Sequence, residues 1–331
     1  MKVSAEVVRL LLFRHSGEAA DWEKEATALV ETIPALAAED AHAEIAKTWR
    51  VVALVQQNSG RLGEAAQSIA KVVEHARLAG DQRLIVRSTL GLAMSAVIGP
   101  TPVLQAIEQC EALIGEGLAD RQVQNLIVCK IALLRAMNGD CDPAREMCQR
   151  ARAILRDLGQ GVRAASASID LAMIELLSGD PAAAEREVRP DCEMLQKIGE
   201  TFFLSSMAAV LARAVRDQGR DDEALEVTRL AEKSAAPNDI DAQVLWRCVR
   251  APILARAGAL EEAEALVRTA LDMAEHIEMP DLLASCWSEL ATVLFLRDHE
   301  HQARQALDEA LRIYDAKGNR MAAQRLRAAM V

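Results

Sequence analysis

Residues 137–146 read MNGDCDPARE, and residues 177–186 read LSGDPAAAER. Each stretch has a glycine where one helix can end and an Asp-Pro pair where the next helix can begin. The two glycines, Gly139 and Gly179, lie 40 residues apart. A stop signal and a start signal that return together at such a distance indicate a repeated structural unit.

Helix-ending residues recur at this spacing along the chain, at intervals of 39 to 43 residues: Gly17, Gly60, Gly99, Gly139, Gly179, Gly219, Gly258 and Asp298. A second set lies about halfway between them: Gly80, Gly117, Gly159, Gly199, Pro237, Pro280 and Gly318. Each unit is therefore expected to contain two helices of roughly 15 to 17 residues joined by short turns.

These helix-ending and helix-starting signals have local physical causes. Glycine can adopt the left-handed conformation that closes a helix. Asp142 or Asp180 can accept hydrogen bonds from the free amides of the next first turn. Pro143 and Pro181 fall near a helix start, where no backbone hydrogen bond is lost.

The last full unit, residues 287–315, reads WSELATVLFLRDHEHQARQALDEALRIYD and resembles the tetratricopeptide pattern. Large residues at Trp287, Leu290 and Leu294 alternate with small ones at Ala291, Ala303 and Ala310, and the same offsets return at Trp49, Val52, Ala53, Ala65, Ile69 and Val72. The resemblance implies paired antiparallel helices in close contact. The chain departs from that family in its period of about 40 rather than 34 residues.

Three strings resemble a more particular group. They are IGPTPVLQAIEQCEAL (98–113), RPDCEMLQKIGETFFLSSMAAVLARAVRDQGRDDEALE (189–226) and PNDIDAQVLWRCVRAPILARAG (237–258). They are similar to the C-terminal, MalT-like helical-repeat region of bacterial signalling proteins that carry a class III adenylate/guanylate cyclase domain and a predicted ATPase. The resemblance implies a scaffold or sensor role without catalysis.

Composition agrees with a helical array and limits the function. About half of the residues are apolar but only 3% are aromatic, and the formal net charge is -11. An acidic chain without clustered Lys, Arg and stacking aromatics is a poor nucleic-acid binder. No stretch reaches the roughly 20 apolar residues of a membrane helix.

The N-terminal residues MKVSAEVVRLLLFRHSGE have no signal-peptide cleavage pattern. Seven cysteines occur without any C-x-x-C pair, which favours reduced thiols buried as small apolar groups. We therefore expect a cytoplasmic protein. The apolar helix expected over residues 7–13 also favours an upstream partner or a longer parent chain.

The sequence contains no phosphate-binding loop, no dinucleotide fingerprint and no G-x-S-x-G motif. The string HEHQA at residues 299–303 begins like a zinc-protease helix, but Ala303 stands where the second metal-binding His would be. His299 and His301, two residues apart, are better explained as part of a solvated turn than as a surface metal site. We expect no enzyme activity, no cofactor and no metal site.

Arginines give the strongest functional indication. In arrays of this type the first helix of each unit lines the concave face, and Arg213, Arg216, Arg247 and Arg250 fall on the first helices of consecutive units. Members of each pair are three residues apart and share a helix face. Their guanidinium groups would suit a peptide carboxylate, an acidic segment or a phosphate. Alternatively, they pair with acidic residues of neighbouring units, such as Asp217, Asp239 or Asp241.

The sequence predicts one all-α, right-handed solenoid over residues 1–331, with seven to eight helix pairs and a capping helix at residues 319–331. The predicted function is a non-enzymatic scaffold that binds a protein or peptide segment, with a cyclase/ATPase module as a possible partner. Two alternatives remain: a small-molecule sensor similar to the repeats of sugar-responsive transcription activators, and a homo-oligomeric structural element.

Overall fold

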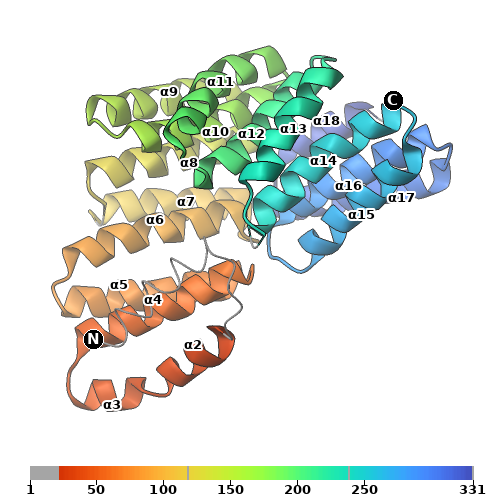
Figure 1. The fold of residues 1–331 in the computed structure, drawn as a ribbon. Coiled ribbons are helices and arrows are strands. Elements are labelled where there is room, and N and C mark those ends of the chain that lie inside the picture. The colour runs from red at the N-terminus through yellow and green to blue at the C-terminus, as the bar shows by residue number, and fades with distance from the viewer. Residues whose placement is uncertain (1–21, 118, 238, 330–331) are drawn as a thin grey trace.

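A computed structural model describes residues 22–117, 119–237 and 239–329, and over these residues α-helix is the only regular secondary structure (Figure 1). The short helices α2 (Trp22–Val30) and α3 (Ile33–Ala38) come first. The apolar helix expected over residues 7–13, and the break at Gly17, lie outside the described residues.

Seven helix pairs follow, each a first helix and a second helix: α4 (His42–Asn58) with α5 (Leu62–Leu78), α6 (Gln82–Ile98) with α7 (Val103–Gly115), α8 (Arg121–Asn138) with α9 (Cys141–Asp157), α10 (Gly161–Ser178) with α11 (Pro181–Ile198), α12 (Phe202–Arg216) with α13 (Asp221–Ser234), α14 (Ile240–Arg256) with α15 (Leu260–Glu275), and α16 (Pro280–Leu296) with α17 (Glu300–Lys317). A last helix, α18 (Arg320–Ala329), ends the described chain. First helices start every 38 to 41 residues. The all-α solenoid with a period of about 40 residues is confirmed.

The turns follow the expected glycine chemistry at most positions. Gly60, Gly139 and Gly179 all have positive φ, and Asp298 adopts the same left-handed region with φ 60. Asp180 caps α11 by accepting a 2.8 Å hydrogen bond from the Ala183 amide.

Two local expectations were wrong. Asp142 does not cap α9, because that helix already begins at Cys141, and its carboxylate pairs instead with Arg145 at 2.6 Å. Gly99 is extended rather than left-handed, with φ -80 and ψ -171. The prolines at 100 and 102 keep the chain out of a second helix until Val103.

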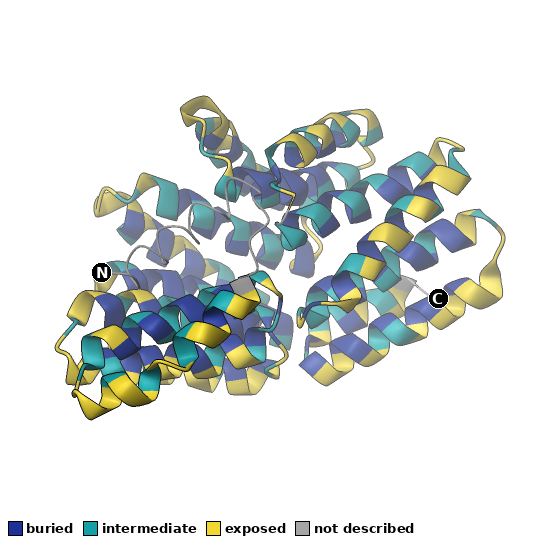
Figure 2. Ribbon diagram, turned by 60° about the horizontal axis from the view of Figure 1, so that its bottom comes forward, coloured by how far each residue is buried: buried dark blue, intermediate teal, exposed yellow. Residues whose placement is uncertain are grey.

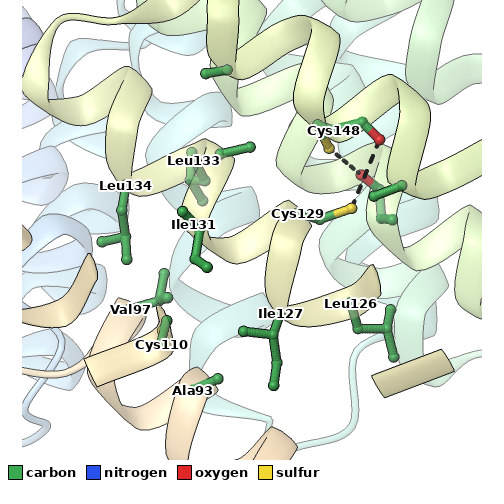
Figure 3. Close-up of a cluster of buried hydrophobic side chains, with 14 of the residues drawn as sticks. Ala93, Val97, Cys110, Leu126, Ile127, Cys129, Ile131, Leu133, Leu134 and Cys148 are labelled. Carbon is green, nitrogen blue, oxygen red and sulfur yellow. Dashed lines mark hydrogen bonds between the residues drawn. The ribbon is translucent and has the colours of Figure 1, made fainter. Parts of the chain in front are cut away.

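The core runs between the paired helices and is built from aliphatic and small side chains. Figure 3 shows one part of it, where Leu134, Ile127 and Val97 lie among the buried cysteines Cys110 and Cys129. Buried residues lie where helices face each other, while exposed residues follow the turns and outer helix faces (Figure 2). All seven cysteines are free and six are buried, in agreement with their expected packing role.

The helices form two layers. From α6 to α16, each first helix contacts the next first helix, whereas second helices make their main contacts with the first helices on either side. In a curved two-layer array the layer with the smaller radius brings successive units closer together. The first helices (α4, α6, α8, α10, α12, α14 and α16) are therefore called the inner layer below.

The array closes on itself. Lys317, 2% exposed, donates hydrogen bonds from its ammonium group to the carbonyl oxygen of Ala96 in the last turn of α6 and to those of Gly99 and Thr101 in the α6–α7 connection. In a second contact between the two ends, the Glu278 amide donates a 2.9 Å hydrogen bond to the Gly60 carbonyl oxygen. The C-terminal units thus return to the N-terminal ones, which Figure 1 shows as blue helices curving back toward the orange ones.

The helix α18 packs on the inner layer against α8 and α10. Its residues Met321 and Ala322 extend the core cluster of those helices. Its start is held by Asn319, which donates a 2.7 Å hydrogen bond to Asp281 and accepts from the Ala322 amide. The helix at the position expected for a cap therefore covers part of the inner layer as well as the end of the array.

Candidate binding surface on the inner helix layer

The four arginines singled out in the sequence lie on α12 and α14, two adjacent helices of the inner layer. They differ in how far their charges are already neutralised within the chain. Ligand binding by these arginines stays a prediction. The hydrogen bonds and ion pairs that each one makes indicate which are available to a ligand.

The charge of Arg216 is neutralised by ion pairs within the protein. Its guanidinium donates to Glu289 on α16 at 2.8 Å and pairs with Asp217 at 2.9 Å. Burial lowers the pKa of Arg216, but the two carboxylates outweigh that effect and raise it overall. This ion pair joins helices two units apart, so it stabilises the curvature of the inner layer and leaves Arg216 little freedom to bind a ligand.

Arg250 is also partnered. Its Nε donates to the Thr228 hydroxyl at 3.0 Å, and its guanidinium lies 2.8 Å from Glu232 on α13. The same group stacks over the Trp246 ring, 4.3 Å from its centroid.

Arg213 and Arg247 have no close carboxylate partner among the described residues. Arg213 has only a long 3.9 Å contact with Asp217, and its buried Nε has no hydrogen-bond partner. Arg247 donates to the backbone and side-chain oxygens of Gln243, both at 2.6 Å, and stacks on Trp246. Burial is the main cause of its lowered pKa. These two side chains are therefore the members of the set best suited to a ligand.

The alternative interpretation of the arginines is correct in part. Asp217 does pair with Arg213 and Arg216, as proposed from the sequence. Asp239 instead caps α14 through the Ala242 amide. Glu289 was not foreseen, because a contact between helices two units apart depends on curvature.

A second group of inner-layer arginines was not singled out from the sequence: Arg50 on α4, Arg87 on α6 and Arg163 on α10. They line a hollow of about 350 Å³ that also involves α5 and α8. No carboxylate of the described residues forms an ion pair with Arg50 or Arg87. Burial, together with the nearby Arg87 charge, lowers the pKa of Arg50, and Asp81 opposes this only in part.

Arg163 has a neutral partner. When the Gln122 side-chain amide turns its oxygen toward the guanidinium, that oxygen accepts two hydrogen bonds, at 2.7 and 2.9 Å. Spacing could not reveal this group, since its members come from the first, second and fourth pairs and are not at one repeated offset. Their common feature in the sequence is only that each falls on a first helix.

The remaining expectations concern metal binding and membrane insertion. In the part of the chain that the structure describes, no three His, Cys, Asp or Glu side chains are grouped to hold a metal ion. The described helices include none that is long and apolar enough to cross a membrane.

Comparison with known structures supports the fold, an all-α solenoid of helical repeats. The chain is similar to the Rap protein complexed with competence and sporulation factor, at TM-score 0.59 and 10% identity, covering 99% of this chain and 98% of that one. It is similar to NprR in complex with its cognate peptide NprX, at TM-score 0.55 and 13% identity, covering 82% and 84% of the two chains.

A kinesin light chain from Podosopora anserina with nearly identical TPR-like repeats is 17% identical at TM-score 0.39, over 56% of this chain and 92% of its own. At these identities the similarity to Rap and NprR shows the fold alone. No family model and no curated protein matches the sequence.

Proposed function

We propose that this protein is a non-enzymatic scaffold that binds a peptide or protein segment on its inner helix layer. The observation that carries the proposal is the unneutralised charge on that layer. Arg50 and Arg87 lack carboxylate partners among the described residues, while Arg213 and Arg247 have weak or neutral ones. Cationic side chains held on a shared, partly apolar surface suit an acidic or carboxylate-bearing segment.

The structural comparisons support this proposal without identifying a ligand. Rap was solved with competence and sporulation factor, and NprR with its cognate peptide. Both chains resemble this one over more than four fifths of its length. A peptide bound to a chain of this fold supports a peptide ligand for the present chain.

A test begins with random peptides displayed on phage and selected on the immobilised chain. Synthetic versions of the selected peptides are then titrated by fluorescence anisotropy, and hydrogen–deuterium exchange locates the binding surface. We expect protection on first helices of the inner layer. Protection confined to the second helices, or the absence of any saturable peptide, would contradict the proposal.

We also propose that the array regulates a bacterial signalling protein in the cytoplasm. The support is the resemblance of residues 98–113, 189–226 and 237–258 to repeats that accompany cyclase and ATPase domains. Free cysteines suit a reducing compartment. Cyclase activity of such a module, measured with and without this array in trans, tests the assignment, and an unchanged rate would contradict it.

One observation favours a second candidate function, the sensing of a small molecule. The hollow of about 350 Å³ lies within the size range of small-ligand sites, and its lining is part apolar and part charged. Native mass spectrometry of the purified chain distinguishes the two functions. A bound metabolite that is lost from an Arg50 variant would favour the sensor.

A further inference from the structure

The hollow is formed by small residues on two inner-layer helices. Gly91, at the middle of α6, has no side chain, and a Cβ there would lie 3.2 Å from the Cδ1 atom of Ile69. Ala53 on α4 and Ser88 on α6 also line the space. A glycine inside a helix lowers helix stability by about 1 kcal/mol relative to alanine. At this position the missing side chain leaves room for the hollow.

The floor is apolar and the rim is cationic. Ile69 and Val72 of α5 contribute the floor, while Arg50, Arg87 and Arg163 contribute the three guanidinium groups. Arg87 is exposed, whereas Arg50 and Arg163 are half-buried. A ligand that reaches the floor must therefore pass groups that attract a negative charge.

The nearby carboxylates do not neutralise this rim. Asp120 lines the hollow, but its Oδ1 accepts a 2.8 Å hydrogen bond from the Val123 amide and caps α8. Asp81 caps α6 in the same way, through the Leu84 amide at 3.0 Å. Both act at helix N-termini, where a negative charge is already stabilised by the helix dipole.

Two other cationic side chains of the inner layer have carboxylate partners. Lys130 on α8 donates to both oxygens of Asp170 on α10, at 2.6 and 2.8 Å, and Arg216 pairs with Glu289. In those cases another first helix supplies the carboxylate. Around Arg50 and Arg87 no described residue does so.

We propose that this hollow is a carboxylate subsite, in which Arg50, Arg87 and Arg163 bind the carboxylate of a peptide whose adjacent apolar side chain rests on Ile69 and Val72. The inference rests on the proposed peptide-binding function and adds the chemical class of the group that is recognised. A guanidinium group binds the two carboxylate oxygens through paired N–H donors, and Arg87 is free to do so without breaking an internal ion pair.

The carboxylate can come from a peptide C-terminus or from an Asp or Glu side chain. Two small probes test the shared chemistry first: N-acetyl-leucinate, which has both the carboxylate and the apolar side chain, and N-acetyl-leucinamide, which lacks the charge. We expect the acid to bind saturably by calorimetry and the amide to bind at least about tenfold more weakly, the loss typical of one charge-assisted hydrogen bond. Equal binding of acid and amide would overturn the subsite.

The variants Arg87→Gln and Arg163→Gln remove one guanidinium each, at exposed and half-buried positions where folding is least affected. Each is expected to weaken acid binding about tenfold and to leave amide binding unchanged. Arg186→Gln, at an exposed position of the second helix α11, is the matched control. An unchanged affinity in both inner-layer variants, with circular dichroism and melting temperature preserved, would overturn the assignment.

Gly91→Leu provides an independent steric test, because its side chain would enter the space above Ile69. It should abolish acid binding while the helical circular dichroism is kept. Should this variant fail to fold, Gly91→Ala is used instead, with a smaller expected loss. Retained binding in a folded Gly91→Leu variant would place the ligand elsewhere.

Peptides selected on the chain separate the two sources of the carboxylate. A C-terminal amide that abolishes Arg87-dependent binding identifies the terminus, whereas Asn or Gln replacements identify a side chain. If peptides bind the inner layer but neither change has an effect, the subsite is wrong and the scaffold stands. If only N-acetyl-leucinate binds, with dependence on Arg87, the subsite stands and the sensor replaces the peptide scaffold.

Discussion

The Lys317 ammonium donates a 2.6 Å hydrogen bond to the carbonyl oxygen of Thr101, a residue 216 positions earlier in the chain. The acceptor is available because the α6–α7 connection is not helical. Pro100 and Pro102 have no amide hydrogen to offer their neighbours, so the carbonyls of this connection are left for an outside donor. An irregular connection in the second pair thus becomes the docking point for the end of the seventh.

The first prediction concerns this closure. Lys317→Met keeps the apolar stem but leaves buried carbonyls without a donor, and it is expected to lower the free energy of unfolding by about 3 kcal/mol. Urea denaturation measures the loss, and hydrogen exchange should rise first in residues 95–102. Lys197→Met, at an exposed position in the last turn of α11, should change stability by less than about 0.5 kcal/mol. Equal effects of the two variants would exclude a special role for Lys317.

The second closing contact is tested at Gly60. A Cβ at this position would lie 2.2 Å from Ile277 Cγ2, and φ is +73. Gly80 has nearly the same φ, +69, but nothing within 4 Å of its Cβ position. Gly80→Ala should therefore cost about 1 kcal/mol from backbone strain alone, and Gly60→Ala clearly more, about 3 kcal/mol. The difference between the two in thermal or urea unfolding measures the contact, and identical losses would show that Ile277 does not press on Gly60.

A third prediction applies to the arginines first identified in the sequence. The double variant Arg213→Glu, Arg247→Glu should weaken binding of selected peptides at least about tenfold, because two attractive charges become repulsive. Circular dichroism should remain helical, which separates a loss of binding from a loss of folding. Arg186→Glu on the second helix α11 is the control for charge alone. Unchanged affinity would remove the α12–α14 arginines from the binding surface.

The fourth prediction is a pH dependence at Glu185. Burial raises the pKa of this carboxyl group, but hydrogen bonds from Gln218, Arg189 and Arg220 outweigh burial and hold it below its ordinary value of 4.5. A carboxyl group with a depressed pKa in the folded state contributes stability that is present above the unfolded pKa. That contribution is lost as the pH falls through the folded value.

Glu185→Gln should therefore be less stable than the parent at neutral pH, and the difference should shrink as the pH falls below about 4. Urea denaturation across this range measures it. Glu146→Gln removes an exposed carboxylate of α9 that pairs with Arg150, and it should follow the parent curve closely. A difference for Glu185→Gln that is constant with pH would show that ionisation of Glu185 does not contribute.

Much of the fold could be predicted because its signals are local and repeated. Gly139 and Gly179 end their helices in the expected way, and Asp180 caps the next one. Local reasoning failed at Asp142, one residue inside its helix, and at Gly99, where two prolines impose an extended path. In both cases a neighbouring residue decided the boundary, which a single-position signal does not reveal.

The sequence by itself determined that this protein is an array of helix pairs, because helix ends, apolar periodicity and small-residue spacing act within one unit or between adjacent units. Only the tertiary structure decided which arginines are neutralised and which are not. Arg216 forms an ion pair with Glu289 two units away, while Arg50 and Arg87 lie close enough for their charges to interact and form no ion pair with a described carboxylate. Those encounters depend on the rotation between successive units, which is small at each step, accumulates over seven pairs and also brings Lys317 to Thr101.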